Sequence, residues 1–307
     1  MPEAHRILVA IPCLNEAATI GKVVADFRRA LPEAVVAVYD NNSTDGTAEL
    51  ARAAGAEVHH VAQRGKGHVV SEIFANASAD VYVLVDGDDT YAAEDARTLV
   101  ELVLSGQADM AIGDRLTGQS DGAHRAHRRL GNHLIVALLN RLFHASFQDV
   151  LSGYRAIGPR VIERVALFGT GFEVETELTV RVLAEGLRIV ETPVGYRARP
   201  EESESKLRAW QDGYRILLAA IILLRDLFPL RFFGLASAGF AALALAMGIL
   251  RILAYTGTST LPTSLLAGLF SLAAILALLS LGIGLILNAI DARAHELGDL
   301  LARRHDS

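Results

Sequence analysis

Two long stretches in the C-terminal third carry no charged residue, and they constrain the fold more than any other feature of the chain. Phe232–Leu250 has 19 residues and Leu261–Ile290 has 30, without a single Asp, Glu, Lys or Arg. About 20 apolar residues in a helix are enough to cross the hydrocarbon core of a bilayer. We therefore expect a transmembrane hairpin over residues 231–290. The alternative is a hairpin buried inside a soluble domain.

The arginines around this hairpin predict its orientation. The flanking arginines are Arg225 and Arg231 before the first stretch and Arg293, Arg303 and Arg304 after the second. Because positive residues gather on the cytoplasmic side of membrane helices, we expect both termini and the N-terminal domain in the cytoplasm. Arg251 lies at the opposite end of the hairpin, where its long side chain can reach the outer interface. The chain is thus predicted to be an integral membrane protein.

A shorter apolar run precedes the hairpin. Ile216–Leu224 has nine apolar residues between Arg215 and Arg225, which is too short to span a bilayer. We interpret it as a helix that lies along the membrane surface. The predicted organisation is a domain over residues 1–212, an interfacial helix over 213–230, the hairpin over 231–290 and a cytoplasmic tail over 291–307.

Apolar runs alternate with helical patterns through residues 1–212. The predicted strands are Ile7–Ile11, Ala34–Tyr39, Glu57–Val61, Asp80–Val85, Ala108–Ile112 and Leu187–Thr192. The predicted helices are Ala17–Leu31, Thr47–Ala54, one that follows a Gly65-Lys66-Gly67 loop, Glu94–Leu104, Leu130–Phe143 and Phe172–Glu185. This alternation predicts an α/β fold with a mostly parallel sheet covered on both faces. No G-x-G-x-x-G follows the first strand, which disfavours a dinucleotide-binding domain.

Composition excludes several classes of protein. The formal net charge is −6 with both signs mixed, which argues against a nucleic-acid-binding surface. Cys13 is the single cysteine, so no internal disulfide can form, and a reducing compartment fits. The first apolar run is too short for the core of a secretory signal peptide.

Three carboxylates crowd the end of the strand predicted at Asp80–Val85. The sequence there reads Asp86-Gly87-Asp88-Asp89-Thr90-Tyr91. Like charges so close repel one another unless a cation lies between them. Ligands of open α/β sheets bind beyond the carboxyl ends of strands, and carboxylates suit Mg²⁺ or Mn²⁺ that carries substrate phosphates. The alternative is a solvated acidic turn.

Further polar motifs follow in a fixed order along the chain. They are Ile11-Pro12-Cys13-Leu14-Asn15-Glu16, Asp40-Asn41-Asn42-Ser43-Thr44-Asp45-Gly46, Gly65-Lys66-Gly67, Asp86-Gly87-Asp88, Gly113-Asp114-Arg115, Asp149-x-x-Ser152-Gly153-Tyr154-Arg155 and Ser205-Lys206. Together they resemble the family-2 glycosyltransferases of GT-A fold, specifically the polyprenyl-phosphate (dolichol- or undecaprenyl-phosphate) hexosyltransferases. The resemblance covers nearly all of residues 6–212, and the hairpin extends it to about residue 290.

The resemblance implies a site for a nucleotide-sugar donor. The implied donor-binding residues are Pro12, Leu14, Glu16, Asp40, Lys66, Asp86 and Gly87. Asp40 can accept a hydrogen bond from a base N–H or a ribose hydroxyl, although residues 40–46 are also turn formers. Asp45 either belongs to the site or caps the following helix.

The same resemblance assigns Asp86 and Asp88 to a Mg²⁺ or Mn²⁺ ion. Asp88 is expected to contact the metal directly, and Asp86 to contact ribose or metal-bound water. The ion would stabilise charge on the departing nucleoside diphosphate. Relatives often carry Gln two positions past the second Asp. Here Thr90 stands there and Asp89 adds a carboxylate, so the metal ligands and donor preference stay open.

The implied acceptor is a polyprenyl phosphate, an anion that needs no strong base to attack a sugar. Arginine fits phosphate bidentately, and the residues implied for the acceptor are Arg115, Arg128, Arg129 and Ser152. Lys206 is expected to close over the donor. The catalytic set is therefore Asp88, Arg115, Arg128, Arg129 and Lys206, although the arginines also fit a solvated basic face near anionic headgroups. Glu173 and Glu175 have either a structural or a substrate-orienting role.

The expected activity is transfer of one hexose with inversion, from UDP-glucose or UDP-N-acetylglucosamine in preference to GDP-mannose. A processive polysaccharide synthase of the same fold is the first alternative, but Q-x-x-R-W is absent around Trp210. A non-catalytic membrane adaptor is the second, and the intact Asp40, Asp86, Asp88 and Arg115 argue against it. A homo-oligomer is compatible with the resemblance.

Overall fold

The structure is a computed structural model of the 307-residue chain. It describes residues 5–116, 136–137, 139–141, 143, 145–168, 171, 174–199, 221–222, 225–226, 228–256 and 262–305. Contacts divide the chain into two compact units, Met1–Ala220 and Ile221–Ser307, and each is described by itself.

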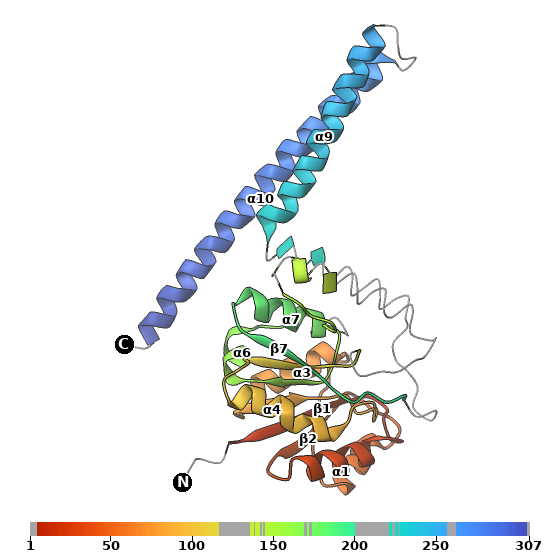
Figure 1. The fold of residues 1–307 in the computed structure, drawn as a ribbon, viewed down its shortest axis with the longest axis vertical. Coiled ribbons are helices and arrows are strands. Elements are labelled where there is room, and N and C mark those ends of the chain that lie inside the picture. Colours follow the sequence, from red (N-terminus) through yellow and green to blue (C-terminus); the bar gives the residue numbers. More distant parts are fainter. Residues whose placement is uncertain are drawn as a thin grey trace. The chain divides into compact units, whose positions relative to one another are not determined.

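The first unit is built on a seven-stranded sheet in the order β3-β2-β1-β4-β6-β5-β7 (Figure 1). The strands are β1 Ile7–Cys13, β2 Val35–Asp40, β3 Glu57–His60, β4 Val81–Leu84, β5 Met110–Asp114, β6 Arg155–Ile157 and β7 Ile189–Pro193. Every pairing is parallel except those of β6, which runs antiparallel to both β4 and β5. The predicted α/β fold with a mostly parallel sheet is confirmed.

Helices cover both faces of this sheet. They are α1 Ile20–Ala30, α2 Thr47–Ala53, α3 Lys66–Asn76, α4 Ala96–Leu104 after a 3-10 turn at Ala93–Asp95, α6 Pro159–Arg164 and α7 Val174–Ala184. Side chains of β1 alternate between the two faces, as the period of a strand requires. Val9 and Ile11 pack with the buried residues of α1 and α4, whereas Leu8 and Ala10 pack with those of α3 and α7. The sheet thus separates two hydrophobic cores.

Several helices and strands begin or end at residues other than those predicted. The predicted Gly65-Lys66-Gly67 loop is wrong in part, because α3 already begins at Lys66. The first helix begins at Ile20 rather than Ala17, and the strand predicted at Ala108–Ile112 occupies Met110–Asp114. The three-residue β6 was not predicted. The helix predicted at Leu130–Phe143 and the interfacial helix at 213–230 lie largely outside the described residues.

The second unit is a pair of long apolar helices, α9 Pro229–Tyr255 and α10 Thr263–His305. Pro229–Tyr255 and Thr263–Ile290 are each long and apolar enough to cross a membrane, and most of their residues are not buried within the protein. Ser237 Oγ donates a 2.8 Å hydrogen bond to the carbonyl of Ala277 and joins the two helices. α10 continues as a helix to His305, through most of the predicted tail.

Candidate active site

The polar residues of the site lie where β1, β2 and β4 end. Cys13 of β1 pairs with Asp40 of β2, and Ala10 of β1 pairs with Leu84 of β4. Because the three strands are parallel neighbours, their carboxyl ends share one edge of the sheet. Asp40 and the segment after Leu84 are therefore brought together at this edge, two strand spacings or about 10 Å apart.

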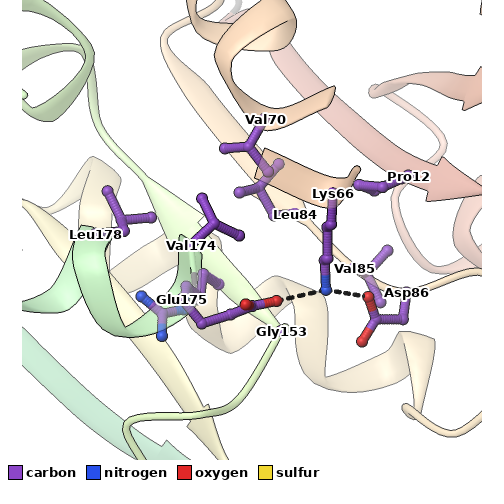
Figure 2. Close-up of a pocket in the computed structure, with 11 residues that line it drawn as sticks. Pro12, Lys66, Val70, Leu84, Val85, Asp86, Gly153, Val174, Glu175 and Leu178 are labelled. Atoms are coloured by element: carbon purple, nitrogen blue, oxygen red, sulfur yellow. Dashed lines mark hydrogen bonds and ion pairs between the residues drawn. The ribbon is translucent and has the colours of Figure 1, made fainter. Parts of the chain in front are cut away.

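Lys66 joins two carboxylates from different elements, as Figure 2 shows. Its Nζ lies 2.5 Å from Asp86 Oδ1 and 2.5 Å from Glu175 Oε1 of α7. Burial alone would lower the pKa of Lys66, but the two carboxylates outweigh it and raise the pKa above its usual value. Burial would likewise raise the pKa of Asp86, and the charge of Lys66 brings that pKa down. Lys66 and Asp86 are therefore both charged at neutral pH.

Asp88 is buried and has a different counter-ion. Its Oδ1 accepts a 2.6 Å hydrogen bond from the Thr90 hydroxyl and a 3.2 Å bond from the Thr90 N–H. Its Oδ2 accepts a hydrogen bond from Arg199 Nη2. Thr90 thus orients Asp88. Arg199 lies after β7, and the sequence did not single it out.

Asp89 does not join this cluster. Its backbone is left-handed, with φ of 58°, and its carboxylate lies 2.6 Å from Lys22 Nζ of α1. Non-glycine residues rarely adopt this conformation, and Asp is among those that tolerate it best. The third carboxylate of the acidic motif is therefore paired with Lys22 instead of standing beside Asp86 and Asp88.

Two glycines allow close approaches in the site. A Cβ on Gly87 would lie 2.6 Å from Cys13 Sγ. A Cβ on Gly153 would lie 2.6 Å from Asp86 Oδ2 and 3.1 Å from Lys66 Nζ. Contacts under 3.0 Å would force these groups apart, so the spacing of the site requires glycine at both positions.

Asp40 presents a buried oxygen with no hydrogen-bond partner among the described residues. Asp40 is 6% exposed, and this oxygen is Oδ1. Its Oδ2 accepts a 3.4 Å bond from the Ser43 N–H and lies 3.6 Å from His60 Nδ1. Leaving a buried acceptor unpaired costs about 1–3 kcal/mol, and a ligand N–H or O–H would remove that cost.

The other residues of the first two motifs shape the site. Asp45 accepts hydrogen bonds from the Ala17 N–H at 3.0 Å and from the Thr47 hydroxyl at 2.5 Å, so it ties the loop after β1 to the start of α2. Glu16 is buried and its N–H donates to Thr47 Oγ1. Leu14 is partly buried, and Pro12 lines the small pocket around Lys66.

Arg115 is held by a buried carboxylate. Its Nε and Nη2 lie 2.6 Å and 2.8 Å from the oxygens of Asp149, which has no exposed surface. Its guanidinium also lies 5.5 Å from the ring centre of Tyr196. Burial alone would lower the pKa of Arg115, but its polar neighbours raise the pKa well above its usual value. Asp149 thus fixes the direction of a permanently charged group.

The Ser152-Gly153-Tyr154-Arg155 motif lies inside the domain. Ser152 is fully buried, accepts a 3.3 Å bond from the Tyr154 N–H and lies 3.4 Å from Tyr91 Oη. Arg155 donates to the carbonyls of Ser152 and Val150 and to the Thr179 hydroxyl. Burial lowers the pKa of Arg155 to about 10, so it remains charged at neutral pH.

Four residues predicted for the site or beside it cannot be placed. Arg128, Arg129, Lys206 and Glu173 lie outside the described residues. Sequence reasoning also missed the partners of the placed residues. Arg199 had no motif of its own, and Asp149 was visible only as the first residue of a motif whose pairing with Arg115 depends on the fold.

The carboxylate oxygens at this edge of the sheet suit a small divalent cation. Within the described residues no group of three or more His, Cys, Asp or Glu side chains could hold a metal by itself. Asp86 and Asp88 are hard oxygen donors, and each is already compensated by a cationic side chain. Mg²⁺ is often bound through one or two carboxylates together with substrate phosphates and water. The two carboxylates are of the kind that such an ion uses.

The sequence is similar to those of known glycosyltransferases. The model of glycosyl transferase family 2 matches residues 8–165. The glycosyltransferase AglJ of Haloferax volcanii is 36% identical over 256 residues, which cover 83% of each chain. The dolichyl-phosphate hexose transferase of the same organism is 31% identical over 211 residues, which cover 68% of this chain and 90% of that one.

Solved structures share the fold. Glucosyl-3-phosphoglycerate synthase from Mycobacterium tuberculosis matches with a TM-score of 0.60 and 23% identity, over 71% of this chain and 80% of that one. That synthase has also been crystallised with Mn²⁺ and UDP. The fold is that of the GT-A glycosyltransferases. The family match and the relatives show that the chain belongs to glycosyl transferase family 2, a family of enzymes.

Proposed function

We propose that this enzyme transfers a single hexose, with inversion, from a nucleoside-diphosphate sugar to a polyprenyl phosphate at the cytoplasmic face of the membrane. The observation that carries the proposal is the shared edge of the sheet, where Asp86 and Asp88 follow β4 and Asp40 ends β2 with an Oδ1 that has no hydrogen-bond partner among the described residues. The dolichyl-phosphate hexose transferase relative and the two long apolar helices support a lipid acceptor.

The residues at this edge suit the donor. Asp40 Oδ1 would accept a hydrogen bond from the base or the ribose. This bond would replace the hydrogen bond to water that burial removes. Asp86 and Asp88 would hold a Mg²⁺ or Mn²⁺ ion, which when bound neutralises the diphosphate. We favour UDP-glucose or UDP-N-acetylglucosamine as donor, and GDP-mannose is the alternative.

The acceptor supplies its own nucleophile. A phosphate oxygen of the lipid forms a bond to the anomeric carbon, while the bond from that carbon to the nucleoside diphosphate breaks. The phosphate is an anion at neutral pH, so the protein must orient it and offset its charge. Arg115, fixed by Asp149, would do so together with Arg128 or Arg129, and Lys206 would close over the donor.

The test is a donor screen with the full-length protein in detergent. Mn²⁺, a short polyprenyl phosphate and each of UDP-glucose, UDP-N-acetylglucosamine and GDP-mannose are combined, and the lipid product is identified by mass. One hexose added from one donor is the expected result. A polymeric product would favour a processive synthase, and no transfer from any donor would favour an adaptor.

A matched pair of variants tests the site. Asp88→Asn should lower transfer at least about a hundredfold, as expected when charge stabilisation at a reacting diphosphate is lost. Asp26→Asn is the control, because Asp26 is an acidic residue of α1 that pairs with Lys22 and Arg29 outside the site. It should retain transfer within about twofold. Equal activity in both variants would remove Asp88 from the mechanism.

A further inference from the structure

The segment that follows β7 runs alongside the acidic motif. The Ala92 N–H donates to the Gly195 carbonyl at 3.1 Å, and the Arg197 N–H donates to the Thr90 carbonyl at 2.7 Å. Tyr91 and Tyr196 form an antiparallel bridge between these two bonds. Backbone hydrogen bonds therefore hold the start of this segment at a fixed position beside the residues that follow Asp88.

This arrangement brings Arg199 to Asp88, two residues beyond the last of these bonds. The Arg199 side chain is 27% exposed and that of Asp88 is 7% exposed. Arg199 Nη2 donates to Asp88 Oδ2, while Thr90 uses Asp88 Oδ1. Both oxygens of the carboxylate assigned to the metal thus have a partner inside the protein.

The two cations of the site differ in how firmly they are held. Lys66 is shared by Asp86 and Glu175, its side chain is 14% exposed, and it projects from the first turn of a helix. Arg199 projects from a segment outside the helices and strands and is about twice as exposed. Lys66 can therefore stay in place as a structural counter-ion, whereas Arg199 can exchange for another cation.

We propose that Arg199 is a built-in competitor of the divalent metal for Asp88, and that it sets the metal affinity of the free enzyme. The proposal rests on the proposed function, because it takes Asp88 as the carboxylate that holds the metal. A divalent ion that reaches Asp88 Oδ2 must either displace the guanidinium of Arg199 or lie in contact with it. Two cations in contact repel each other. Metal binding alone is thereby weakened.

This competition couples the metal to the donor. A nucleoside diphosphate brings negative charge to the same edge, which offsets the repulsion between the metal and the displaced guanidinium. The donor should therefore raise the affinity for the metal, and the metal should raise the affinity for the donor by the same factor. The free enzyme would carry little metal until a donor arrives.

The test is a titration of the full-length protein with Mn²⁺ in the absence of nucleotide, with free Mn²⁺ followed by electron paramagnetic resonance. Arg199→Gln should bind Mn²⁺ about fivefold more tightly than the wild type, since it removes one partly exposed ion pair. Arg199→Lys keeps the charge and should stay near the wild type. Arg197→Gln, an exposed arginine two residues earlier, is the control and should leave the affinity unchanged.

The Asp88→Asn variant distinguishes a wrong metal assignment from a wrong proposal of competition by Arg199. If Asp88→Asn binds Mn²⁺ as the wild type does, the metal assignment in the proposed function is wrong. If Asp88→Asn loses binding while Arg199→Gln equals the wild type or binds more weakly, the competition is wrong and the metal assignment stands. No binding by either the wild type or Arg199→Gln also overturns the competition. Thermal unfolding of each variant confirms that it is folded.

Discussion

The charge of Lys66 holds two carboxylates of the site together. Lys66 is the cation that lies between Asp86 and Glu175, at 2.5 Å from each carboxylate. Lys66→Met would leave two largely buried carboxylates facing each other, and we expect the free energy of unfolding to fall by about 3 kcal/mol. Chemical denaturation of the detergent-solubilised protein measures this loss.

The double variant gives the control for this prediction. Lys66→Met combined with Glu175→Gln leaves only one carboxylate without its cation, so it should be less destabilised than the sum of the two single variants. Strict additivity would contradict the shared ion pair. A cycle of Arg97→Met and Glu33→Gln, an exposed pair 3.3 Å apart, should show a coupling below about 1 kcal/mol.

At the residue scale, the sequence predicted which groups gather but not what they pair with. Asp40, Asp86 and Asp88 follow predicted strands, and parallel strands bring their carboxyl ends to one edge. The Arg199–Asp88 contact joins residues 111 positions apart, and no local pattern records such a distance. The ion pair between Lys22 and Asp89 likewise joins residues 67 positions apart.

The start of α2 is held by one carboxylate, that of Asp45. Partial burial alone would raise the pKa of Asp45, but hydrogen bonds from Thr47 and from the Ala17 N–H outweigh it and lower the pKa below its usual 3.8. A lowered folded-state pKa contributes stability above pH 3.8, and this contribution is lost as the pH falls through the folded-state value.

Asp45→Asn should therefore be less stable than the wild type at pH 7, by less than about 1 kcal/mol because the group is exposed. The difference should shrink as the pH falls below about 4, since only the wild type then loses its ionised carboxylate. Unfolding midpoints measured from pH 7 to pH 3 test this. A difference that stays constant over that range would contradict a stabilising role of the ionised Asp45 carboxylate.

The packing of α9 against α10 supplies a second prediction at the element scale. A Cβ on Gly284 would lie 2.9 Å from Phe233 Cβ and 3.4 Å from the Pro229 carbonyl oxygen. Gly284→Leu should push the helices apart and destabilise the hairpin by about 1–3 kcal/mol. Gly282→Leu is the matched control on the same helix, because a Cβ at Gly282 meets nothing within 4 Å. Thermal unfolding in detergent should separate the two variants, and equal behaviour would refute this packing.

Elements with strong periodicity were predictable, and short ones were not. α1 buries Ile20, Val23, Val24 and Phe27, which is the spacing of one helix face. β6 has three residues and is held by β4 on one side and β5 on the other, so its place comes from tertiary pairing rather than from its own sequence.

At the scale of the whole molecule, the family and the fold follow from ordered motifs, while the placement of the active site at one membrane face remains a prediction. The two long helices satisfy the length and apolarity of membrane spans. Their orientation rests on the arginines alone, and the fold of either unit does not depend on it. A labelling experiment is needed to decide which end of the hairpin faces the cytoplasm.

Cys13 makes that experiment direct, because it is the single cysteine of the chain and is 2% exposed. Thr258→Cys places a thiol between the two apolar stretches, and Ser307→Cys places one beyond the second. With an impermeant maleimide added to intact cells, Thr258→Cys should be labelled and Ser307→Cys should be labelled only after permeabilisation. The wild type should show little labelling in either case. The reverse pattern would put the catalytic domain on the outer face, away from cytoplasmic nucleotide sugars, and would overturn the proposed direction of transfer.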